Sequence, residues 1–443
     1  MSQLKAISPI DGRYASRTEP LQEVFSEYAL IKYRFIFEVR YFNYIIKLLD
    51  LSPFKFTHTF TETDAQNIKY LEKTTNHDVK AVELYLKSLL PTELEHLSNY
   101  VHFGLTSQDV NTTVYTLQLK IFTQHHYIPL LNKILKFTLP PIPMLSRTHG
   151  QPATPTTFQQ QTLIFVTRLI EQINQLKTYH YRTKLGGATG DLNAHKCAYP
   201  KHDWDRLLTV FLNDEFGFTR LYPTTQISHY DDYAEYFSIV QRINTILIDL
   251  CKDIWHYISI NYLIQIPNST ETGSSTMPHK VNPIDFENAE GNLQISNTLL
   301  QFFQTKLPVS RLQRDLTDST VLRNVGTAFG HSYLAITSIR RGLNKIAPNE
   351  TQILKDLNDH PEILAEAYQT TLRTLQPPLK TDPYQLFKDF TRGNPDITME
   401  TLHKFLDTLK DEVPSKVLSK LKKLTPASYA LATSPAPAFS SST

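Results

Sequence analysis

The sequence predicts an all-α protein built around a central bundle of five long helices. First, apolar residues repeat at steps of three and four along five long segments between Thr106 and Leu343, the pattern of helices with one buried face. Second, only 13 of the 443 residues are glycine, about half of the ordinary share of roughly 7 %. Third, the chain has neither a G-x-G-x-x-G nor a P-loop pattern. These observations argue against β-sandwiches, barrels and glycine-rich nucleotide folds.

The N-terminal part, residues 1–105, is predicted to be a smaller domain of shorter and more polar helices. The central domain, residues 106–346, begins with a long helix that starts near Thr106 or Ser107. Pro129 is expected to kink this first helix, because proline removes a backbone donor and clashes with the preceding turn.

The other four long helices of the bundle are identified by their apolar stripes. The second runs through Phe158 to Leu176, the third from an N-cap at Ser228 to Tyr257, the fourth through Phe286 to Leu307, and the fifth through Val321 to Ile346. The third helix would be roughly 45 Å long at a rise of about 1.5 Å per residue. A stripe of that length needs an equally long partner to bury it, and this requirement predicts a bundle.

The C-terminal part, residues 347–430, is predicted to be a third, smaller domain, because its helices are interrupted by prolines, among them Pro348, Pro361, Pro377, Pro378 and Pro383. The last residues, 431–443, are mostly Ser, Ala and Pro without periodicity, and they are predicted to form a disordered tail.

Charge and cysteine content limit the classes of partner. Lys and Arg together number 45 against 43 Asp and Glu, a net charge of +2, which is too small to favour nucleic acid or a membrane as the main partner. The two cysteines, Cys197 and Cys251, are too few for a disulfide framework. The N-terminus lacks the apolar region of a signal peptide, and no apolar run approaches about 18 residues. We therefore expect a soluble protein of the cytoplasm, in which any anion site must be local.

Two loops between the predicted long helices concentrate reactive side chains. Residues 143–155 place His149 in a proline-rich stretch that excludes regular helix. Because an imidazole exchanges protons near neutral pH, this histidine is either a structural loop residue or a proton donor. Residues 270–283 combine a glycine, paired serines, Lys280 and Asn282 just before the fourth helix. This second loop is either a solvated connector or part of an active site.

The motifs around these loops resemble a known family. The string G-S-S-T-M-P-H-K-V-N-P at 273–283 resembles the signature loop of the fumarase/aspartase superfamily, whose members eliminate fumarate. Four further strings, S-P-I-D-G-R-Y at 8–14, T-T-N-H-D-V-K-A-V-E at 74–83, R-T-H-G-Q-P-A-T-P at 147–155 and R-D-L-T-D-S-T-V-L-R at 314–323, resemble those of adenylosuccinate lyases of the longer bacterial type. The resemblance implies a three-domain fumarase/aspartase-like fold, a homotetramer with each site shared by three subunits, no metal and no organic cofactor.

The resemblance implies cleavage of adenylosuccinate to AMP and fumarate, and of SAICAR, its succinylated imidazole-carboxamide ribotide counterpart, to AICAR and fumarate. Such an elimination needs a base that removes a proton next to a carboxylate, and an acid that protonates the departing nitrogen. By position in the motifs, Ser274 would be the base and His149 the acid. A serine alkoxide would need help from Lys280, from backbone N–H groups and from exclusion of water when the loop closes.

The remaining matched positions are expected to bind substrate. Phosphate contacts are expected from Arg13, Tyr14, Ser319 and Arg323, and Arg314 is expected to reach the nucleotide. The succinyl group is expected at Thr106, Ser107, Thr148, Gln226, Ser275, Lys280, Asn282 and Asn288. Asn76, His77 and Asp78 are expected near the base and the bond that breaks. For His77, two roles stay open, direct proton transfer or orientation of His149 and the substrate.

Structural and functional alternatives remain at several of these positions. Arg314 and Arg323 could form ordinary ion pairs at a helix start, and Thr106 or Ser107 could simply cap a helix. Asp191 is left out of the predicted site, because a carboxylate there would repel an anionic substrate where relatives often have an amide. An argininosuccinate lyase would share the Ser274 loop but would have no phosphate to bind. A scaffold protein derived from a lyase would have no need of both catalytic residues.

Overall fold

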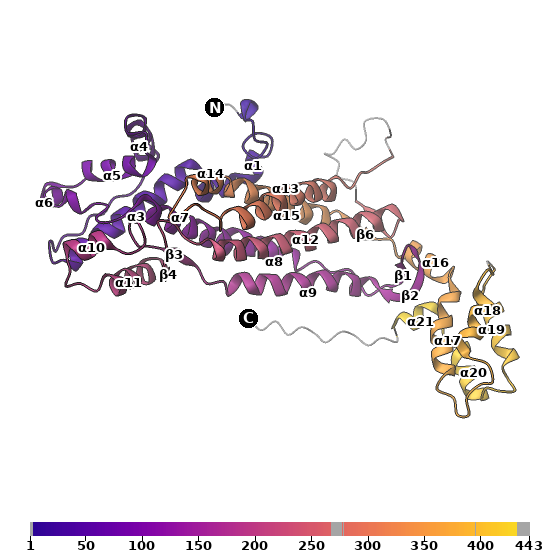
Figure 1. Ribbon diagram of the computed structural model, residues 1–443. Helices are drawn as coiled ribbons and strands as arrows, with labels where there is room; N and C mark the ends of the chain where they lie inside the picture. Colours follow the sequence, from indigo (N-terminus) through magenta and orange to yellow (C-terminus); the bar gives the residue numbers. More distant parts are fainter. Residues whose placement is uncertain (1–2, 267–276, 278, 395, 432–443) are drawn as a thin grey trace. The chain divides into compact units, whose positions relative to one another are not determined.

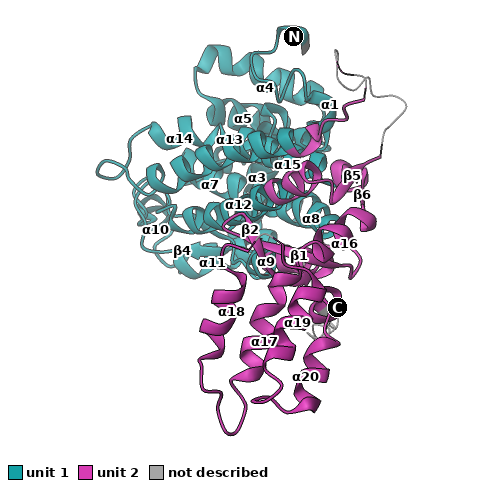
Figure 2. Ribbon diagram, turned by 90° about the vertical axis from the view of Figure 1, so that its right-hand side faces the viewer, with its two compact units in different colours: residues 1–134, 169–251, 287–340 teal, residues 135–168, 252–286, 341–443 magenta. Residues whose placement is uncertain are grey.

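The computed structural model describes residues 3–266, 277, 279–394 and 396–431, and most of these residues are helical (Figure 1). The chain folds into two compact units that each combine separate stretches of sequence (Figure 2). The first unit takes residues 1–134, 169–251 and 287–340, and the second takes 135–168, 252–286 and 341–443. The domain boundaries after residues 105 and 346 stay predictions.

The N-terminal helices of the first unit include one that is longer and more apolar than predicted. They are α1 (Ala15–Thr18), α2 (Gln22–Phe25), α3 (Glu27–Leu48), α4 (Glu62–Thr75), α5 (Asp78–Ser88) and α6 (Thr92–Glu95), with 3₁₀ turns at Gln3–Lys5, Glu19–Leu21 and Ser98–Tyr100. The prediction of short helices is wrong for α3, which has 22 residues and buries Phe35 and Phe42 in a core cluster. Its apolar face also contains the buried charged residues Arg34 and Glu38, which made the segment look more polar than it is.

The first helix of the predicted bundle begins where the sequence indicates. Thr106 is the N-cap residue of α7 (Ser107–Ile121), and the chain continues through a π-helical turn over Phe122–Tyr127 into α8 (Ile128–Ile134). Pro129 follows this π turn at once. Because proline has no backbone N–H to donate, the ladder of an α-helix cannot continue unchanged there, and the wider turn accommodates the defect.

The other bundle segments contain α9 (Phe158–Lys177), α12 (Asp231–Ser259), α13 (Ile284–Lys306), α14 (Thr317–Leu322) and α15 (Val325–Leu343). The predicted N-cap at Ser228 is wrong. Tyr230 takes a positive φ of 58°, so α12 can begin only after it, and the Ser228 hydroxyl instead accepts the N–H of Tyr230 at 3.2 Å. The fifth segment is two helices, because the backbone bond from Asn324 to Val321 closes α14 as a tight turn.

Buried polar and aromatic side chains join the long helices within the first unit. Asn244 of α12 donates to Ser296 of α13 at 3.1 Å and accepts from Ser332 of α15 at 2.7 Å. The rings of Phe122 and Phe329 pack with their centroids 4.6 Å apart. Because a buried amide without partners is costly, these hydrogen bonds favour one register of the three helices (Figure 1).

Within the described residues, three short strand pairs accompany the helices, and the sequence pattern predicted none of them. In the first unit, β3 (Arg182–Lys184) and β4 (Thr219–Leu221) pair in parallel beside α10 (Asn193–Ala198) and α11 (Trp204–Phe216). In the second unit, β1 (Pro143–Thr148) and β2 (Gln151–Thr157) form a hairpin, and β5 (Leu263–Gln265) pairs with β6 (Ile346–Pro348). Ile346, predicted to lie on a helix, therefore belongs to a strand.

The C-terminal helices of the second unit enclose a core of their own. They are α16 (Glu350–Asn358), α17 (Ala365–Leu372), α18 (Pro383–Thr391), α19 (Met399–Thr408), α20 (Ser415–Lys422) and α21 (Pro426–Leu431), with a 3₁₀ turn at Pro361–Leu364. Leu364, Tyr368, Phe387 and Leu402 are buried in this core. The predicted tail falls outside the described residues after Leu431. Among the described helices, none is both long and apolar enough to cross a membrane.

Candidate active site

A cavity of about 270 Å³ in the first unit brings together seven residues of the predicted site. They are Asn76, His77, Asp78, Ser107, Arg314, Ser319 and Arg323. The other lining residues, which the sequence did not indicate, are Arg34, Glu72, Asn111, Tyr115 and Leu316. The cavity therefore joins two motifs and the start of the first bundle helix, which lie far apart in the sequence.

His77 is held at a helix start by its own ring. Asn76 ends α4 with a left-handed φ of 51°, and His77 becomes the N-cap of α5, where its Nδ1 accepts the backbone N–H of Lys80 at 3.1 Å. Nδ1 is therefore unprotonated, and Nε2 lies 3.4 Å from the hydroxyl of Ser107. An imidazolium would need a proton on Nδ1 and would break the cap, so the arrangement favours the orienting role over proton transfer.

Asp78 faces two guanidinium groups at the floor of the cavity. Its Oδ2 lies 2.9 Å from Arg34 Nη2 and 2.9 Å from Arg323 Nη2, and its Oδ1 accepts the N–H of Val79 at 2.9 Å. Burial raises the pKa of the Asp78 carboxyl, but Arg34, the Val79 N–H and Arg323 outweigh burial and hold the pKa below its usual range. The carboxylate is thus charged at neutral pH and carries one negative charge against two positive ones.

A second group of polar side chains surrounds Arg314. Its Nη2 donates to the Ser319 hydroxyl at 3.0 Å, and its Nη1 donates to Gln226 Oε1 at 3.2 Å. Its Nε lies 3.7 Å from the buried Asp318, which also accepts from Tyr230 at 3.0 Å. Arg314 can therefore form the ion pair and still belong to the predicted site. Asp318 lies beside its Nε, while its Nη1 and Nη2 contact other residues of the predicted site.

The start of α7 is fixed by a buried carboxylate. Asp109 accepts the N–H of Thr106 at 2.8 Å, of Gly186 at 2.8 Å and of Gly187 at 3.1 Å. It also pairs with Lys184 Nζ at 2.7 Å, and both side chains are fully buried. Burial lowers the pKa of Lys184, while Asp109 opposes that shift. Asp109 therefore connects the glycine loop at Gly186 and Gly187 to the segment that contains Thr106 and Ser107.

Other predicted residues of the first unit do not line this cavity. Asn288 donates to the Tyr14 hydroxyl at 3.3 Å and accepts from Ser338 at 3.0 Å. Arg13 is exposed. Gln226 lines a different cavity of about 490 Å³ beside the loop 311–316, to which it is joined through Arg314.

His149 lies at the tip of the β1–β2 hairpin of the second unit. Thr148 pairs with Gln151, and the two residues between them have positive φ, 53° at His149 and 77° at Gly150. Positive φ at both central residues marks a two-residue type I′ turn. Thr148 and His149 are exposed. The turn therefore presents the predicted acid to solvent on a strand pair.

Both strands of this hairpin are tied to C-terminal helices of the same unit. Arg147 pairs with Asp356 of α16 at 2.7 Å, and Tyr262 also donates to Asp356. On the other strand, Thr154 donates to Glu366 of α17 at 2.7 Å.

The remaining residues of the predicted loop are only partly described. Lys280 is exposed and Asn282 is half-buried in the same unit as His149, and the N–H of Lys280 donates to Met277 at 3.0 Å. Ser274 and Ser275 lie outside the described residues.

Comparisons with known proteins agree with these motifs. A family model described as Lyase matches residues 50–295, and one described as Adenylosuccinate lyase C-terminal matches residues 310–430. The chain is 46 % identical to an adenylosuccinate lyase of Dictyostelium discoideum, with 97 % of each chain covered. It is 41 % identical to an adenylosuccinate lyase of Escherichia coli, again with 97 % of each covered.

Solved structures share the fold. A fumarate lyase from Mesorhizobium superposes with a TM-score of 0.70 at 17 % identity, covering 93 % of this chain and 94 % of the other. A 3-carboxy-cis,cis-muconate lactonizing enzyme from Pseudomonas putida gives a TM-score of 0.68 at 18 % identity, covering 93 % of each. The predicted all-α, fumarase/aspartase-like fold is confirmed.

Proposed function

Because the chain belongs to the adenylosuccinate lyase family, a family of carbon–nitrogen lyases in purine biosynthesis, we propose that it cleaves both adenylosuccinate and SAICAR. The products are AMP and fumarate from the first, and AICAR and fumarate from the second. The observation that carries this proposal is the 270 Å³ cavity, where Arg314, Ser319 and Arg323 meet the Asn76–Asp78 segment. Guanidinium and hydroxyl donors suit a phosphate dianion, which both substrates carry.

In the proposed reaction, Ser274 removes the proton next to a carboxylate of the succinyl group. The electrons form the carbon–carbon double bond of fumarate, and His149 gives its proton to the departing nitrogen. The exposed position of His149 on a two-residue turn supports this role, because the imidazole is accessible to a substrate. Lys280 is exposed and its ammonium group is available to stabilise the carboxylate-bearing intermediate.

The remaining predicted residues bind the two charged ends of the substrate. Arg13, Tyr14, Arg314, Ser319 and Arg323 are proposed for the nucleotide and its phosphate. The succinyl part is proposed to lie near Thr106, Ser107, Thr148, Gln226, Ser275, Lys280, Asn282 and Asn288. Asn76, His77 and Asp78 are proposed to lie near the base and the bond that breaks. Argininosuccinate has no phosphate, so the guanidinium groups beside Ser319 favour the nucleotide substrates.

A homotetramer in the cytoplasm is proposed, with each active site shared by three subunits. One surface of α13 supports subunit contact in this proposal. Ile295 and Phe302 are each 49 % exposed, and a Cβ added at Gly291 would meet nothing within 4 Å. These positions differ by four, seven and eleven residues and therefore lie on one face of the helix. Such an exposed apolar strip fits a partner helix of another subunit.

We expect the purified protein to convert adenylosuccinate and SAICAR, and to leave argininosuccinate unchanged, in parallel ultraviolet assays. The reason is that only the first two carry the phosphate that Arg314 and Arg323 are proposed to bind. Turnover of argininosuccinate alone would contradict the proposal. Absence of turnover with all three substrates would favour the scaffold alternative.

Replacement of His77 by asparagine tests its role in orientation. The amide oxygen of the variant can still cap α5, and the amide nitrogen can still donate, but the shorter side chain reaches less far. We expect kcat to fall by about tenfold, with the pH–rate profile unchanged in shape. A lost limb of that profile, measured from pH 5.5 to 9, would instead assign His77 to proton transfer.

A further inference from the structure

Arg34 contributes a guanidinium group to the cavity that neither the motifs nor the proposed mechanism uses. It lies in α3, is 2 % exposed, and reaches Asp78 Oδ2 at 2.9 Å through its Nη2. Its Nε donates to Asn111 Oδ1 of α7 at 2.9 Å. Its Nη1 is buried without a hydrogen-bond partner in the part of the chain that the structure describes. A buried cation of this kind cannot give up its carboxylate without a large desolvation cost.

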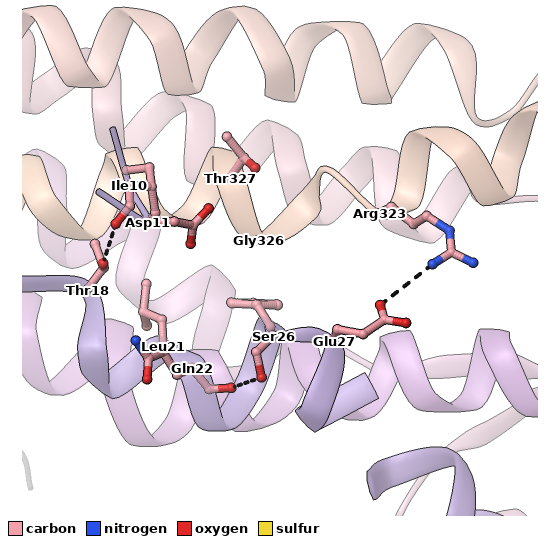
Figure 3. A pocket seen from close by; sticks show the side chains of 12 residues that line it. Ile10, Asp11, Thr18, Leu21, Gln22, Ser26, Glu27, Arg323, Gly326 and Thr327 are labelled. Carbon is pink, nitrogen blue, oxygen red and sulfur yellow. Dashed lines mark hydrogen bonds and ion pairs between the residues drawn. The ribbon is translucent and has the colours of Figure 1, made fainter. Parts of the chain in front are cut away.

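Arg323 pairs with the same carboxylate, but its side chain is far more exposed than that of Arg34. Its Nη2 lies 2.9 Å from Asp78 Oδ2, but its side chain is 48 % exposed. Its Nη1 lies 3.7 Å from Glu27. Figure 3 shows the guanidinium turned toward Glu27, at one end of a neighbouring cavity of about 300 Å³. Arg323 lines both this cavity and the 270 Å³ cavity. It can therefore leave Asp78 at much lower cost than Arg34 can.

The two arginines thus differ in how firmly they hold the Asp78 carboxylate. We propose that Arg34 is a positioning residue for Asp78. In the ligand-free protein, Asp78 serves as the counter-ion of Arg323. When the phosphate of a substrate takes Arg323, Arg34 and Asn111 keep Asp78 in place and keep its charge compensated. This inference rests on the proposed function, because it requires that Arg323 binds an anionic group.

The proposed role of Arg34 affects how tightly the protein binds an anion. With Arg34 present, an arriving phosphate exchanges one partner of Arg323 for another, and Asp78 retains its buried partner. Without the Arg34 guanidinium, the same exchange leaves Asp78 with no guanidinium partner, at 21 % side-chain exposure and close to the incoming anion. Removal of this guanidinium therefore destabilises the anion-bound state more than the free state.

The test compares Arg34→Lys, Asn111→Ala and Lys32→Gln in the full chain. Lysine keeps the charge but cannot bond Asn111 and Asp78 together as the planar fork does. Asn111→Ala leaves the guanidinium but removes its second anchor. Lys32 lies on the same helix, and its ion pair is with Glu23 at 3.1 Å, so its replacement is the matched control.

We expect Arg34→Lys to raise the KM for adenylosuccinate and the Kd of inorganic phosphate by about tenfold each, with kcat within about twofold. Asn111→Ala should raise both by about threefold, and Lys32→Gln should leave them unchanged. Phosphate binding is measured by calorimetric titration and needs no turnover, so failure of the proposed function is seen separately, as wild-type protein that does not cleave adenylosuccinate.

An unchanged phosphate Kd in folded Arg34→Lys would overturn the inference. A fall in kcat and melting temperature, with the phosphate Kd unmoved, would assign Arg34 a purely structural role. If Arg34→Lys does not fold, Asn111→Ala decides by the same criterion.

Discussion

Replacement of Ser274 by alanine is expected to lower the turnover of adenylosuccinate by at least about a thousandfold. General-base catalysis contributes about 10²- to 10⁴-fold, and alanine provides no oxygen that could accept the proton. The Kd of the substrate should stay within about threefold of the wild-type value, because the proposed phosphate and succinyl contacts come from other residues. The single-turnover rate and an equilibrium titration with adenylosuccinate measure the two quantities independently.

The control for this variant is Ser269→Ala, which removes a serine hydroxyl five positions earlier in the chain. It should have the wild-type rate. A Ser274→Ala enzyme with near-normal turnover would require a different base, and His149 and His77 would then be tested in the same way.

Replacement of Asp109 by asparagine is expected to cost about 3–5 kcal/mol of folding stability, the range for loss of one partner from a buried ion pair. Without that carboxylate nothing on Asp109 opposes the effect of burial on the pKa of Lys184, so the fully buried ammonium must either stay uncompensated or give up its proton. The amide oxygen of asparagine can accept fewer of the three N–H groups that Asp109 now binds, from Thr106, Gly186 and Gly187. The start of α7 and the glycine loop should therefore loosen together.

Urea unfolding at a fixed protein concentration measures this loss, because the proposed assembly would make the midpoint depend on concentration. The matched control is Asp359→Asn. Asp359 pairs with Lys355 on the surface at 2.6 Å, with 54 % and 65 % of the side chains exposed, so its loss should cost less than about 1 kcal/mol. Equal midpoints for the two variants would contradict the prediction.

The helical part of the fold followed from the sequence because long apolar stripes have one simple solution, burial against other long helices. Periodicity placed α9, α12 and α13 correctly, and the hydroxyl at Thr106 marked the start of α7. It did not locate the beginning of α12, because the left-handed backbone at Tyr230 depends on tertiary structure and cannot be predicted from the pattern of apolar residues. The break between α14 and α15 was missed because the turn closed by the Asn324–Val321 backbone bond leaves the helical spacing of Val321 and Val325 unchanged.

The candidate site was predictable where motifs carry the chemistry and not where burial does. His77, Asp78, Arg314 and Arg323 come from matched strings, and the cavity brings them together. Arg34 lies among apolar residues of α3, where a lone arginine looks like a surface position. Its spacing of four from the buried Leu30 and Glu38 was the one available signal.

The hairpin that presents His149 was missed because its strands are short and contain prolines. Its turn did have a recognisable signal, the dipeptide formed by His149 and Gly150. Histidine and glycine both tolerate positive φ, as a two-residue turn requires. A hairpin of this type could therefore have been considered from the dipeptide alone.

With His149 as the proposed acid, the anchoring of that hairpin would give the C-terminal region a part in catalysis. Arg147 and Thr154 flank His149, and each depends on an acidic residue more than two hundred positions later, Asp356 and Glu366. Glu366 in turn accepts the hydroxyl of Tyr429, near the end of the described chain. Damage to the last ninety residues, which include both anchors, would then act as an enzyme defect even where every proposed catalytic side chain is intact, and a truncated protein would be a poor substitute for the whole in inhibitor screening.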